Sequence, residues 1–398
     1  MRSIREIFVT GYGPSSSHTM GPVFAAQYIL KKYADPKYVK VTLYGSLALT
    51  GKGHLTDYAL DQQLKFVPHE IVFDCETPAK HPNTMLFTIT KEDGKIENET
   101  ILSIGGGTIV TRDNAYDFVG YEIYPEHNLK EVILYCKKNH ISLEEYVIRH
   151  EGEDILTYLD NVYQTMENAR LRGISTSGKL PGSLGVERKA HEMFMNMRKA
   201  KDGKTNIHMN VAIASFAVAE ENAAGGLIVI APTCGSAGVI PGAITYLKMK
   251  DYSRRQIVRG LLVAGLIGII AKTNASISGA ECGCQAEIGV ACAMAAAMLA
   301  DVQDIGIDNV AQAAEIAMEH SLGLTCDPID GYVQIPCIER CAIFALKAIN
   351  AATLAKLIPA MEAKVSFDQS LATMYSTGLD LKEGYRETSL SGLAKLVK

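Results

Sequence analysis

Nine cysteines occur in the sequence, and seven of them fall between residues 234 and 341. Clustered thiols in a reducing compartment are more often metal ligands or catalytic groups than disulfides. Three of them, Cys284, Cys326 and Cys337, are spaced as C-x41-C-x10-C, which matches neither zinc fingers nor ferredoxins. One metal or cluster could still draw on all three if distant loops meet in space. The alternative is that these thiols are simply buried as small apolar side chains.

Prolines beside two of these cysteines favour the metal interpretation. Cys326 is followed by Asp327 and Pro328, and Cys337 is preceded by Pro336. Because proline fixes its own φ and restricts the residue before it, these thiols are expected to be held rigidly. Rigid thiolates suit a metal cluster. Three further cysteines lie nearby in the sequence and leave the choice of ligands open: Cys234, Cys282 and Cys341.

A run of hydroxyls and one histidine precedes a predicted helix near the N-terminus. The segment reads Gly-Pro-Ser-Ser-Ser-His-Thr from residue 13 and contains Ser15, Ser16, Ser17 and His18. The start of a helix presents free backbone N–H groups and binds anions readily. The segment therefore predicts a binding site for a carboxylate or phosphate. The alternative is a helix N-cap with additional serines.

A second glycine-rich segment, residues 45–54, ends in Gly-Lys-Gly-His. It differs from a phosphate-binding P-loop, because five residues separate Gly45 from Gly51 and glycine follows the lysine. A nucleotide is therefore not expected. Lys52 and His54 bring a cation and an imidazole onto this backbone, which suits general base catalysis on a small acid. A structural loop is the alternative. No lysine has a convincing Schiff-base setting, so pyridoxal phosphate is not expected either.

The elements that must position these residues fall into two parts. Residues 1–126 mix a predicted helix with short runs that alternate or are continuously apolar, as strands do. We expect an α+β domain here, a helix-backed sheet that is partly antiparallel. The expected helix spans 21–34, and the expected strands span 39–47, 69–74, 84–90 and 100–110.

Residues 127–398 are predicted to form a mainly α-helical domain. The segments 129–139 and 142–170 repeat apolar residues every three to four positions. Between 206 and 300 the helices are rich in Ala and Gly and apolar nearly all round, which is typical of a buried helix bundle. The breaks between them hold five of the clustered cysteines, at 231–242, 274–284 and 324–337.

Composition limits the class of protein. The chain has 398 residues, 47% hydrophobic and 21% charged, with a net charge of −5, which excludes disorder and offers no basic surface for nucleic acid. The N-terminus lacks the apolar segment of a signal peptide. The longest apolar run, 261–271, is far shorter than the about 20 residues of a membrane-spanning helix. We therefore expect a cytoplasmic protein with a small-molecule partner, no nucleic acid and no membrane.

Several segments together resemble the iron–sulfur-dependent L-serine dehydratases (L-serine ammonia-lyases), in the form that fuses a β-type and an α-type part in one chain. The β-type likeness rests on GPSSSHTMGP (13–22), GSLALTGKGH (45–54) and SIGGG (103–107). The α-type likeness rests on KLPGSLGVERKA (179–190), EENAAGG (220–226), APTCGSAGVIPG (231–242), the segment 274–297, and LTCDPIDGYVQIPCIER (324–340). YRETSLSGLA (385–394) extends it almost to the C-terminus.

The resemblance implies a lyase that converts L-serine to pyruvate and ammonia by β-elimination, without pyridoxal phosphate. It implies a [4Fe–4S] cluster on Cys284, Cys326 and Cys337, whose fourth iron has no protein thiolate and acts as a Lewis acid. Because the histidines lie in the first half and the cysteines in the second, the active site is expected between the two domains.

Residue roles follow from assigning the steps of this reaction to residues of the matched segments. His54 is the expected base, with His18 and Lys52 as further catalytic residues. Ser15, Ser16, Ser17 and His18 would hold the carboxylate or the iron-bound oxygen. Lys52, Asn274 and Ser276 would contact substrate charge or cluster sulfur. The alternatives are a related lyase acting on L-cysteine or L-threonine and a non-catalytic cluster-based sensor. A homodimer is expected only because it is the commonest oligomeric state of soluble proteins that assemble.

Overall fold

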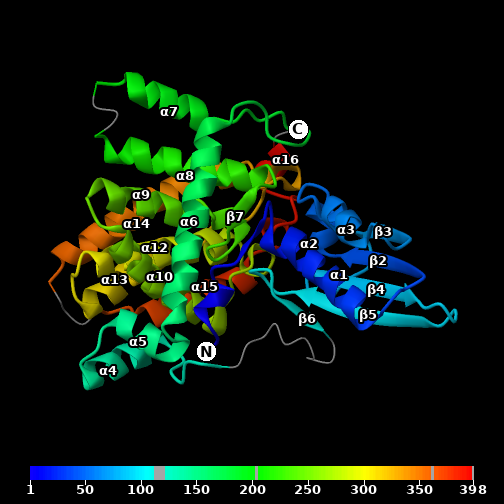
Figure 1. Ribbon diagram of the computed structural model, residues 1–398, viewed down its shortest axis with the longest axis horizontal. Coiled ribbons are helices and arrows are strands. Elements are labelled where there is room, and N and C mark those ends of the chain that lie inside the picture. The colour runs from blue at the N-terminus through cyan, green and yellow to red at the C-terminus, as the bar shows by residue number, and fades with distance from the viewer. Residues whose placement is uncertain (112–121, 202–204, 360–362, 397–398) are drawn as a thin grey trace.

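The computed structural model describes residues 1–111, 122–201, 205–359 and 363–396. A sheet-containing part lies beside a larger helical part (Figure 1). The expected fold class, an α+β region followed by a mainly helical region with a buried bundle, is confirmed.

The sheet has five strands in the order β3-β2-β4-β5-β6. β2 and β3 pair in parallel and the other pairs are antiparallel, which confirms the partly antiparallel sheet. Helices α1 and α3 bury apolar side chains against it (Figure 1). The elements are α1 (Gly21–Lys32), β2 (Tyr38–Tyr44), α2 (Ser46–Thr50), α3 (Thr56–Leu64), β3 (His69–Asp74), β4 (Thr84–Thr90), β5 (Ile96–Ser103) and β6 (Ile109–Thr111).

Two predicted strands differ from the structure, and both differences arise at glycines. The run 39–47 ends as a strand at Tyr44, because Gly45 adopts φ +58° and starts α2. The run 100–110 is two strands, β5 and β6. They are joined by a turn whose Gly105, Gly106 and Gly107 all have positive φ, a conformation that other residues rarely adopt. The bounds of β3 and β4 are those predicted.

The helical part is built around α12 (Val290–Val302), whose residues 290–300 are all buried. Small alanine side chains allow neighbouring helices to approach it closely on every side, so its apolar surface is covered by protein. Helices α9 (Val239–Met249), α10 (Arg254–Asn274), α13 (Ile307–Glu319) and α14 (Cys337–Leu357) pack against it. The other helices of this part are α4 (Leu129–Asn139), α5 (Leu143–Glu151), α6 (Asp154–Ser175), α7 (Ala190–Lys199), α8 (Ile207–Ala223) and α15 (Phe367–Asp380).

Two helical stretches are long and apolar enough to cross a membrane by length and composition, α10 and the stretch Gln285–Val302. Of their most apolar windows, 78% and 83% of the residues are buried inside the protein. Their apolar surfaces are therefore already covered by neighbouring helices, as in the core of a soluble protein.

The two ends of the chain connect the sheet part to the helical part. Met1, Ile4 and Phe8 belong to the helical core. Strand β1 (Thr10–Tyr12) then pairs antiparallel with β7 (Leu227–Val229) before the chain enters the sheet. At the other end, residues 385–388 return to the boundary, where Ser46 of the sheet part donates a hydrogen bond to the Glu387 carbonyl oxygen. The division at residue 126 stays a prediction.

Candidate active site

Ser15 and the turn after it fix His18 at the boundary between the two parts. Residues Ser16–Met20 form a π-helical turn, all of it buried, that runs directly into α1. The Ser15 hydroxyl caps this turn by accepting a hydrogen bond from the His18 N–H at 3.0 Å. Single π-helical turns of this kind are often found at functional sites. The predicted helix start is therefore present, and its side chains face the interior.

The hydrogen bonds of His18 define its tautomer. Its Nε2 lies 2.9 Å from the Ser46 hydroxyl, which itself donates to the Glu387 carbonyl oxygen at 2.6 Å. Because the Ser46 proton is used in that bond, Nε2 must carry the proton of the imidazole. The other nitrogen, Nδ1, therefore holds a lone pair, 3.8 Å from Glu387 Oε1 and 3.5 Å from the Ser15 hydroxyl.

His54 is held the other way round. Its Nδ1 donates to the Thr50 carbonyl oxygen at 3.0 Å, so its lone pair is on Nε2. That atom is buried without a hydrogen-bond partner and lies 3.6 Å from Glu387 Oε1. The His18 and His54 ring centroids are 4.5 Å apart. Burial lowers the pKa of His54 to about 4 and that of His18 well below its usual range, so both rings are neutral at pH 7.

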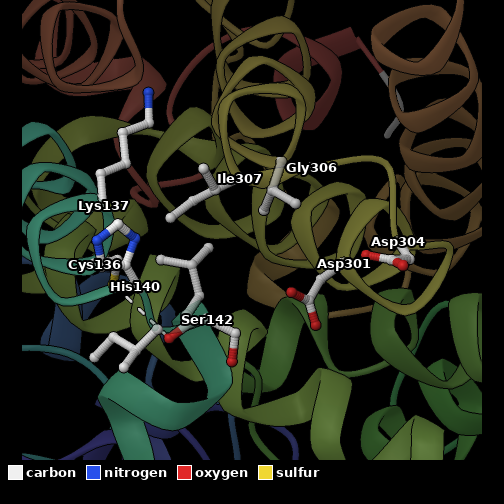
Figure 2. Close-up of a pocket in the computed structure, with 11 residues that line it drawn as sticks. Cys136, Lys137, His140, Ser142, Asp301, Asp304, Gly306 and Ile307 are labelled. Carbon is white, nitrogen blue, oxygen red and sulfur yellow. Dashed lines mark hydrogen bonds between the residues drawn. The ribbon is translucent and has the colours of Figure 1, made fainter.

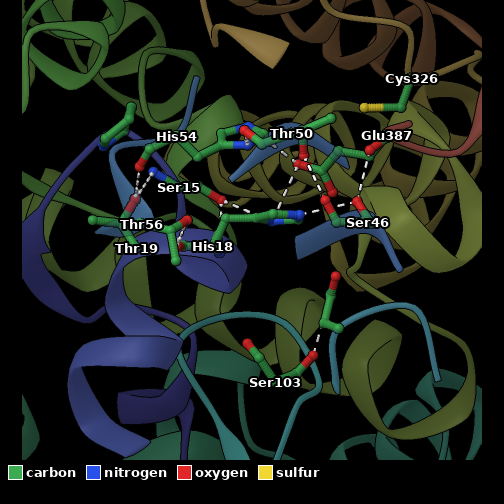
Figure 3. A network of polar contacts seen from close by, with 12 residues as sticks. Ser15, His18, Thr19, Ser46, Thr50, His54, Thr56, Ser103, Cys326 and Glu387 are labelled. Carbon is green, nitrogen blue, oxygen red and sulfur yellow. Dashed lines mark hydrogen bonds and ion pairs between the residues drawn. The ribbon is translucent and has the colours of Figure 1, made fainter. Parts of the chain in front are cut away.

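Glu387 completes this cluster, a functional residue that was not predicted from the sequence. Its Oε1 and the two free imidazole nitrogens lie within 4.8 Å of one another, close enough for one bound ion to contact all three. Figure 3 shows the two imidazoles and Glu387 together, with Cys326 beside Glu387. Burial raises the pKa of Glu387 well above its usual range. The sequence feature that could have identified Glu387 is its position as the acidic residue of the matched segment YRETSLSGLA.

The predicted cysteines gather on the helical side of the boundary. Cys284 lies between Gly283, at φ +74°, and a second π-helical turn, Gln285–Gly289. Cys326 is in the loop before α14, and Cys337 is the first residue of α14. The Cys284 and Cys326 sulfurs lie 4.0 and 3.9 Å from Glu287 Oε2, in a second group able to hold a metal ion.

The charges around these thiols are coupled, and Cys337, which is outside this group, responds to them. A hydrogen bond from Cys326, assisted by the Arg340 guanidinium, lowers the pKa of Cys284 to about 6. Burial raises the pKa of Cys337 well above its usual range, and the nearby Cys284 charge adds to this. Burial and Cys284 raise the pKa of Glu287 to about 8. Arg340 and Glu287 were not singled out from the sequence.

The two clusters touch through the C-terminal segment. The Glu387 N–H donates to the Cys326 carbonyl oxygen at 2.7 Å, and the Cys326 N–H donates to the Tyr385 carbonyl oxygen at 2.8 Å. On the sheet side, a Cβ on Gly53 would lie only 2.7 Å from the Asp330 carbonyl oxygen, so glycine is required for this loop to reach the cysteine-bearing loop. The expected position between the two parts agrees with this geometry.

Several predicted site residues lie elsewhere. Lys52 is exposed, with its Nζ 5.6 Å from the centroid of the Phe73 ring. Asn274 is also exposed and donates to the His127 and Ile270 carbonyl oxygens. Ser276 is buried but donates to Glu281. The structure therefore does not bring these three to either cluster. Ser16 and Ser17 are buried beside His18.

The additional cysteines near the predicted ligands have other neighbours. The Cys234 thiol lies 3.9 Å from the Met20 sulfur. The Cys341 thiol lies 3.3 Å from the Gly235 carbonyl oxygen. A hydrogen bond links Cys282 to Ser276. None of the three belongs to the group formed by Cys284, Glu287 and Cys326 in the described part of the chain.

A cavity of about 480 Å³ lies close to the histidine cluster. Its walls include Ser46 from the sheet part, Ala280 beside the cysteine loop, and Arg386 and Thr388 from the C-terminal segment. Ser46 also bonds to His18, so one residue in the cavity wall contacts the cluster.

Removing the Ser46 hydroxyl should disturb His18 specifically. In Ser46→Ala, the buried His18 Nε2–H loses its acceptor, which should lower the free energy of unfolding by about 1–3 kcal/mol. Denaturant titration measures this, with iron content expected to be unchanged. Ser175→Ala, at an exposed helix end, is the control. Equal stability of the two variants would contradict the assigned hydrogen bond.

A second cavity, of about 350 Å³, lies far from this chemistry. Figure 2 shows its walls, which come from the α4–α5 connection and the α12–α13 connection and hold no predicted site residue. Asp301 lines it with one carboxylate oxygen buried and without a hydrogen-bond partner. Burial, and next the Glu144 charge, raise the pKa of Asp301 to about 8.

The raised pKa of Asp301 predicts a pH-dependent stability. The folded chain holds this proton more tightly than the unfolded chain, so the associated stability is complete below about pH 4 and is lost as the pH rises through about 8. Asp301→Asn removes that loss and should be more stable than wild type at pH 8 by at least about 1 kcal/mol. Unfolding measured from pH 5 to 9 tests this, with Asp304→Asn as control. Parallel curves for wild type and Asp301→Asn would contradict it.

Comparisons with known proteins agree with this arrangement. The family model described as serine dehydratase beta chain matches residues 3–64, and the one described as serine dehydratase alpha chain matches residues 83–394. The chain is 40% identical to L-serine dehydratase 2 of Escherichia coli, over 99% of this chain and 98% of that protein. It is 38% identical to L-serine dehydratase of Haemophilus influenzae and 39% to that of Helicobacter pylori strain J99, each over at least 99% of both chains. The chain therefore belongs to the serine dehydratase family, with the beta-type and alpha-type parts fused in one polypeptide.

Proposed function

We propose that this chain converts L-serine to 2-aminoacrylate, which hydrolyses to pyruvate and ammonia, at a [4Fe–4S] cluster held by Cys284, Cys326 and Cys337. The observation that carries the proposal is the buried lone pair of His54 Nε2, without a hydrogen-bond partner, close to a group of buried cysteines. A general base and a set of soft metal ligands thus meet at one domain boundary.

The residues present fit such a cluster. The Cys284 and Cys326 sulfurs both lie beside Glu287, Cys337 at the start of α14 responds to the Cys284 charge, and Cys284 already favours the thiolate form that ligation needs. The Arg340 guanidinium donates to the Thr325 carbonyl oxygen at 2.8 Å and places a positive charge beside the thiolates. When bound, a cluster with one open iron would supply a Lewis acid for the substrate hydroxyl and carboxylate.

The protein's own groups would move the proton and orient the substrate. His54 Nε2 accepts the Cα proton, while the Thr50 carbonyl oxygen holds the ring in the required tautomer and stabilises the imidazolium that forms. The Ser15 hydroxyl lies 3.5 Å from His18 Nδ1 and, with the buried Ser16 and Ser17, would orient a substrate oxygen. Because both imidazoles are fully buried, bulk water is excluded from the reacting centre.

The test is anaerobic purification with iron and sulfide analysis, coupled to serine-dependent pyruvate formation. The proposal expects about four iron atoms per chain for a [4Fe–4S] cluster, and pyruvate formation that disappears when air removes the metal. A colourless, metal-free and fully active protein would overturn it. L-cysteine and L-threonine are compared in the same assay, with sulfide release reporting turnover of cysteine.

The setting of the enzyme is part of the proposal. Free thiols and an oxygen-sensitive cluster require a reducing compartment, and we place the protein in the cytoplasm on that ground. The homodimer stays a prediction.

A further inference from the structure

Two buried serines at the boundary between the two parts have hydroxyls without a hydrogen-bond partner in the described chain. Ser103, the last residue of β5, is 0% exposed. Ser278, which precedes the short helix α11 (Gly279–Cys282), is 3% exposed. Neither hydroxyl forms a hydrogen bond, and Ser278 does not cap the helix that it precedes. Buried polar groups of this kind are costly unless a ligand satisfies them.

Their place in the fold distinguishes these serines from other buried ones. Ser215 and Ser370 also have hydroxyls without partners, but both lie inside helices. A serine inside a helix can turn its hydroxyl toward the carbonyl oxygen of the residue four positions earlier. Ser103 ends a strand and Ser278 lies in a loop, so neither has that alternative.

Ser103 packs against the helix that begins after the His18 turn. A Cβ on Gly21, the first residue of α1, would collide with Ser103 Oγ, so glycine is needed there for this approach. Asn83 Nδ2 donates to the Ser103 carbonyl oxygen at 3.2 Å, and the Ser103 N–H donates to the Asn83 carbonyl oxygen at 3.0 Å. The backbone groups of Ser103 are therefore used, and its hydroxyl alone is free for a ligand. Figure 3 shows Ser103 below the two histidines.

Ser278 lies between the glycine turn that follows Ser103 and the cysteines. A Cβ on Gly105 would lie 3.5 Å from the Ser278 Cβ, so the turn and the serine loop are in direct contact. A Cβ on Gly279, the residue after Ser278, would lie 3.2 Å from Cys326 Sγ. The two free hydroxyls thus belong to one strip of the boundary, which extends from the start of α1 to the cysteine loop.

The chemistry of this strip suits an anion. Besides the two serines, the three glycines 105–107 are buried, and their N–H groups form no hydrogen bond within the described residues. A carboxylate accepts several hydrogen bonds, and bonds to a charged group are the strong ones. An ammonium could use only the hydroxyl oxygens and would leave the amide N–H groups unpaired. Asn83 Oδ1, an acceptor without a partner, is not part of this donor set.

We propose that the Ser103 and Ser278 hydroxyls, with the N–H groups of the turn 105–107, bind the carboxylate of the substrate. This inference rests on the proposed function, because it takes L-serine to react at this boundary. It gives Ser278 the substrate contact that was expected for Ser276, whose hydroxyl donates to Glu281. The hydroxyls of residues 15–17 are then left for the other substrate oxygen.

The experiment compares L-alanine with L-alaninamide on the anaerobically purified holoenzyme, by titration calorimetry. These ligands have no β-hydroxyl to eliminate and differ only in a carboxylate or a neutral amide. A site built for one group strongly rejects the analogue that lacks it, so wild type should prefer L-alanine by about 100-fold or more. Ser103→Ala and Ser278→Ala should each weaken L-alanine binding by about 10- to 100-fold, the range for a hydrogen bond to a charged group, and change L-alaninamide binding by less than about 3-fold.

The stability of the variants separates ligand binding from a structural role. Because neither hydroxyl has a partner to lose, denaturant titration without added amino acid should find both variants at least as stable as wild type. Ser215→Ala is the matched control, since it removes an equally buried hydroxyl without a partner from α8. It should keep the wild-type preference for L-alanine.

Two results would overturn the inference. One is a wild type without preference for L-alanine over L-alaninamide, including one that binds neither, and this result does not depend on any variant folding. The other is a pair of folded variants, Ser103→Ala and Ser278→Ala, that both keep the wild-type affinity for L-alanine. Pyruvate formation from L-serine in the same wild-type preparation separates the two proposals. Turnover without carboxylate preference refutes this inference alone, and carboxylate preference without turnover refutes the proposed function alone.

Discussion

Replacing His54 by glutamine lowers kcat for L-serine by about 10²- to 10⁴-fold, the range attributed to a single general base. Glutamine is close in size and can still donate to the Thr50 carbonyl oxygen, which His54 Nδ1 does at 3.0 Å, but it cannot accept the Cα proton. Since the Nε2 atom has no hydrogen-bond partner to lose, folding should be largely preserved. Steady-state pyruvate formation is the measurement, with iron content unchanged.

The pH profile of the wild type provides a second observation on the same residue. Burial lowers the pKa of His54 to about 4, so the ring stays unprotonated and able to accept a proton from neutral pH down to about that value. His54 should therefore cause no loss of activity between pH 8 and 6. His69→Gln, which changes a histidine paired with Asp61 at the sheet edge, is the control. A His54→Gln enzyme with kcat within a factor of about 3 of wild type would refute the base assignment.

Cys326→Ser should remove both the cluster and the activity. A serine hydroxyl is a poor ligand for iron–sulfur clusters, which are held by thiolates. The same substitution removes the hydrogen bond that most lowers the pKa of Cys284. We expect at least about a 10³-fold loss of pyruvate formation, together with loss of iron, acid-labile sulfide and visible absorption.

Cys75→Ser and Cys136→Ser are the controls for thiol chemistry away from this site. Cys75 is exposed, and the Cys136 thiol donates to the Ser142 carbonyl oxygen in the remote cavity. Both variants should keep iron and activity. If Cys326→Ser kept its iron, or if Cys75→Ser lost it, the ligand set would have to be reassigned.

The local pattern of apolar and polar residues predicts most of the helices and strands. The errors occur at glycines, whose backbone conformation the sequence does not reveal. Strands 69–74 and 84–90 were located to the residue because they combine β-branched and aromatic residues with turns at both ends. The run 100–110 read as one strand, because a sequence does not show that three consecutive glycines adopt positive φ and reverse the chain. Helix type was clear for 142–170, but the break at Gly152, between α5 and α6, was not.

The candidate site was predicted only as far as short motifs extend. His18 and His54 lie in glycine- and serine-rich segments that attract attention, and both reach the cluster. Glu387 could not be predicted in this way, because its position depends on a contact with Ser46, 341 positions earlier in the chain. Lys52 and Asn274 have suitable chemistry, yet their side-chain directions are set by packing against Phe73 and by bonding to His127.

The late position of Glu387 in the chain has a consequence for synthesis. The cores of both parts draw almost entirely on residues before 375, whereas the groups at the boundary come from positions 18, 54, 326 and 387. During translation the bundle can therefore begin to compact while the catalytic boundary is still open on one side. A chain interrupted just before Glu387 would keep most of its buried apolar surface and yet lack a group of the histidine cluster. The bundle can thus fold before the catalytic boundary is complete, because Glu387 is among the last of these residues to be synthesised.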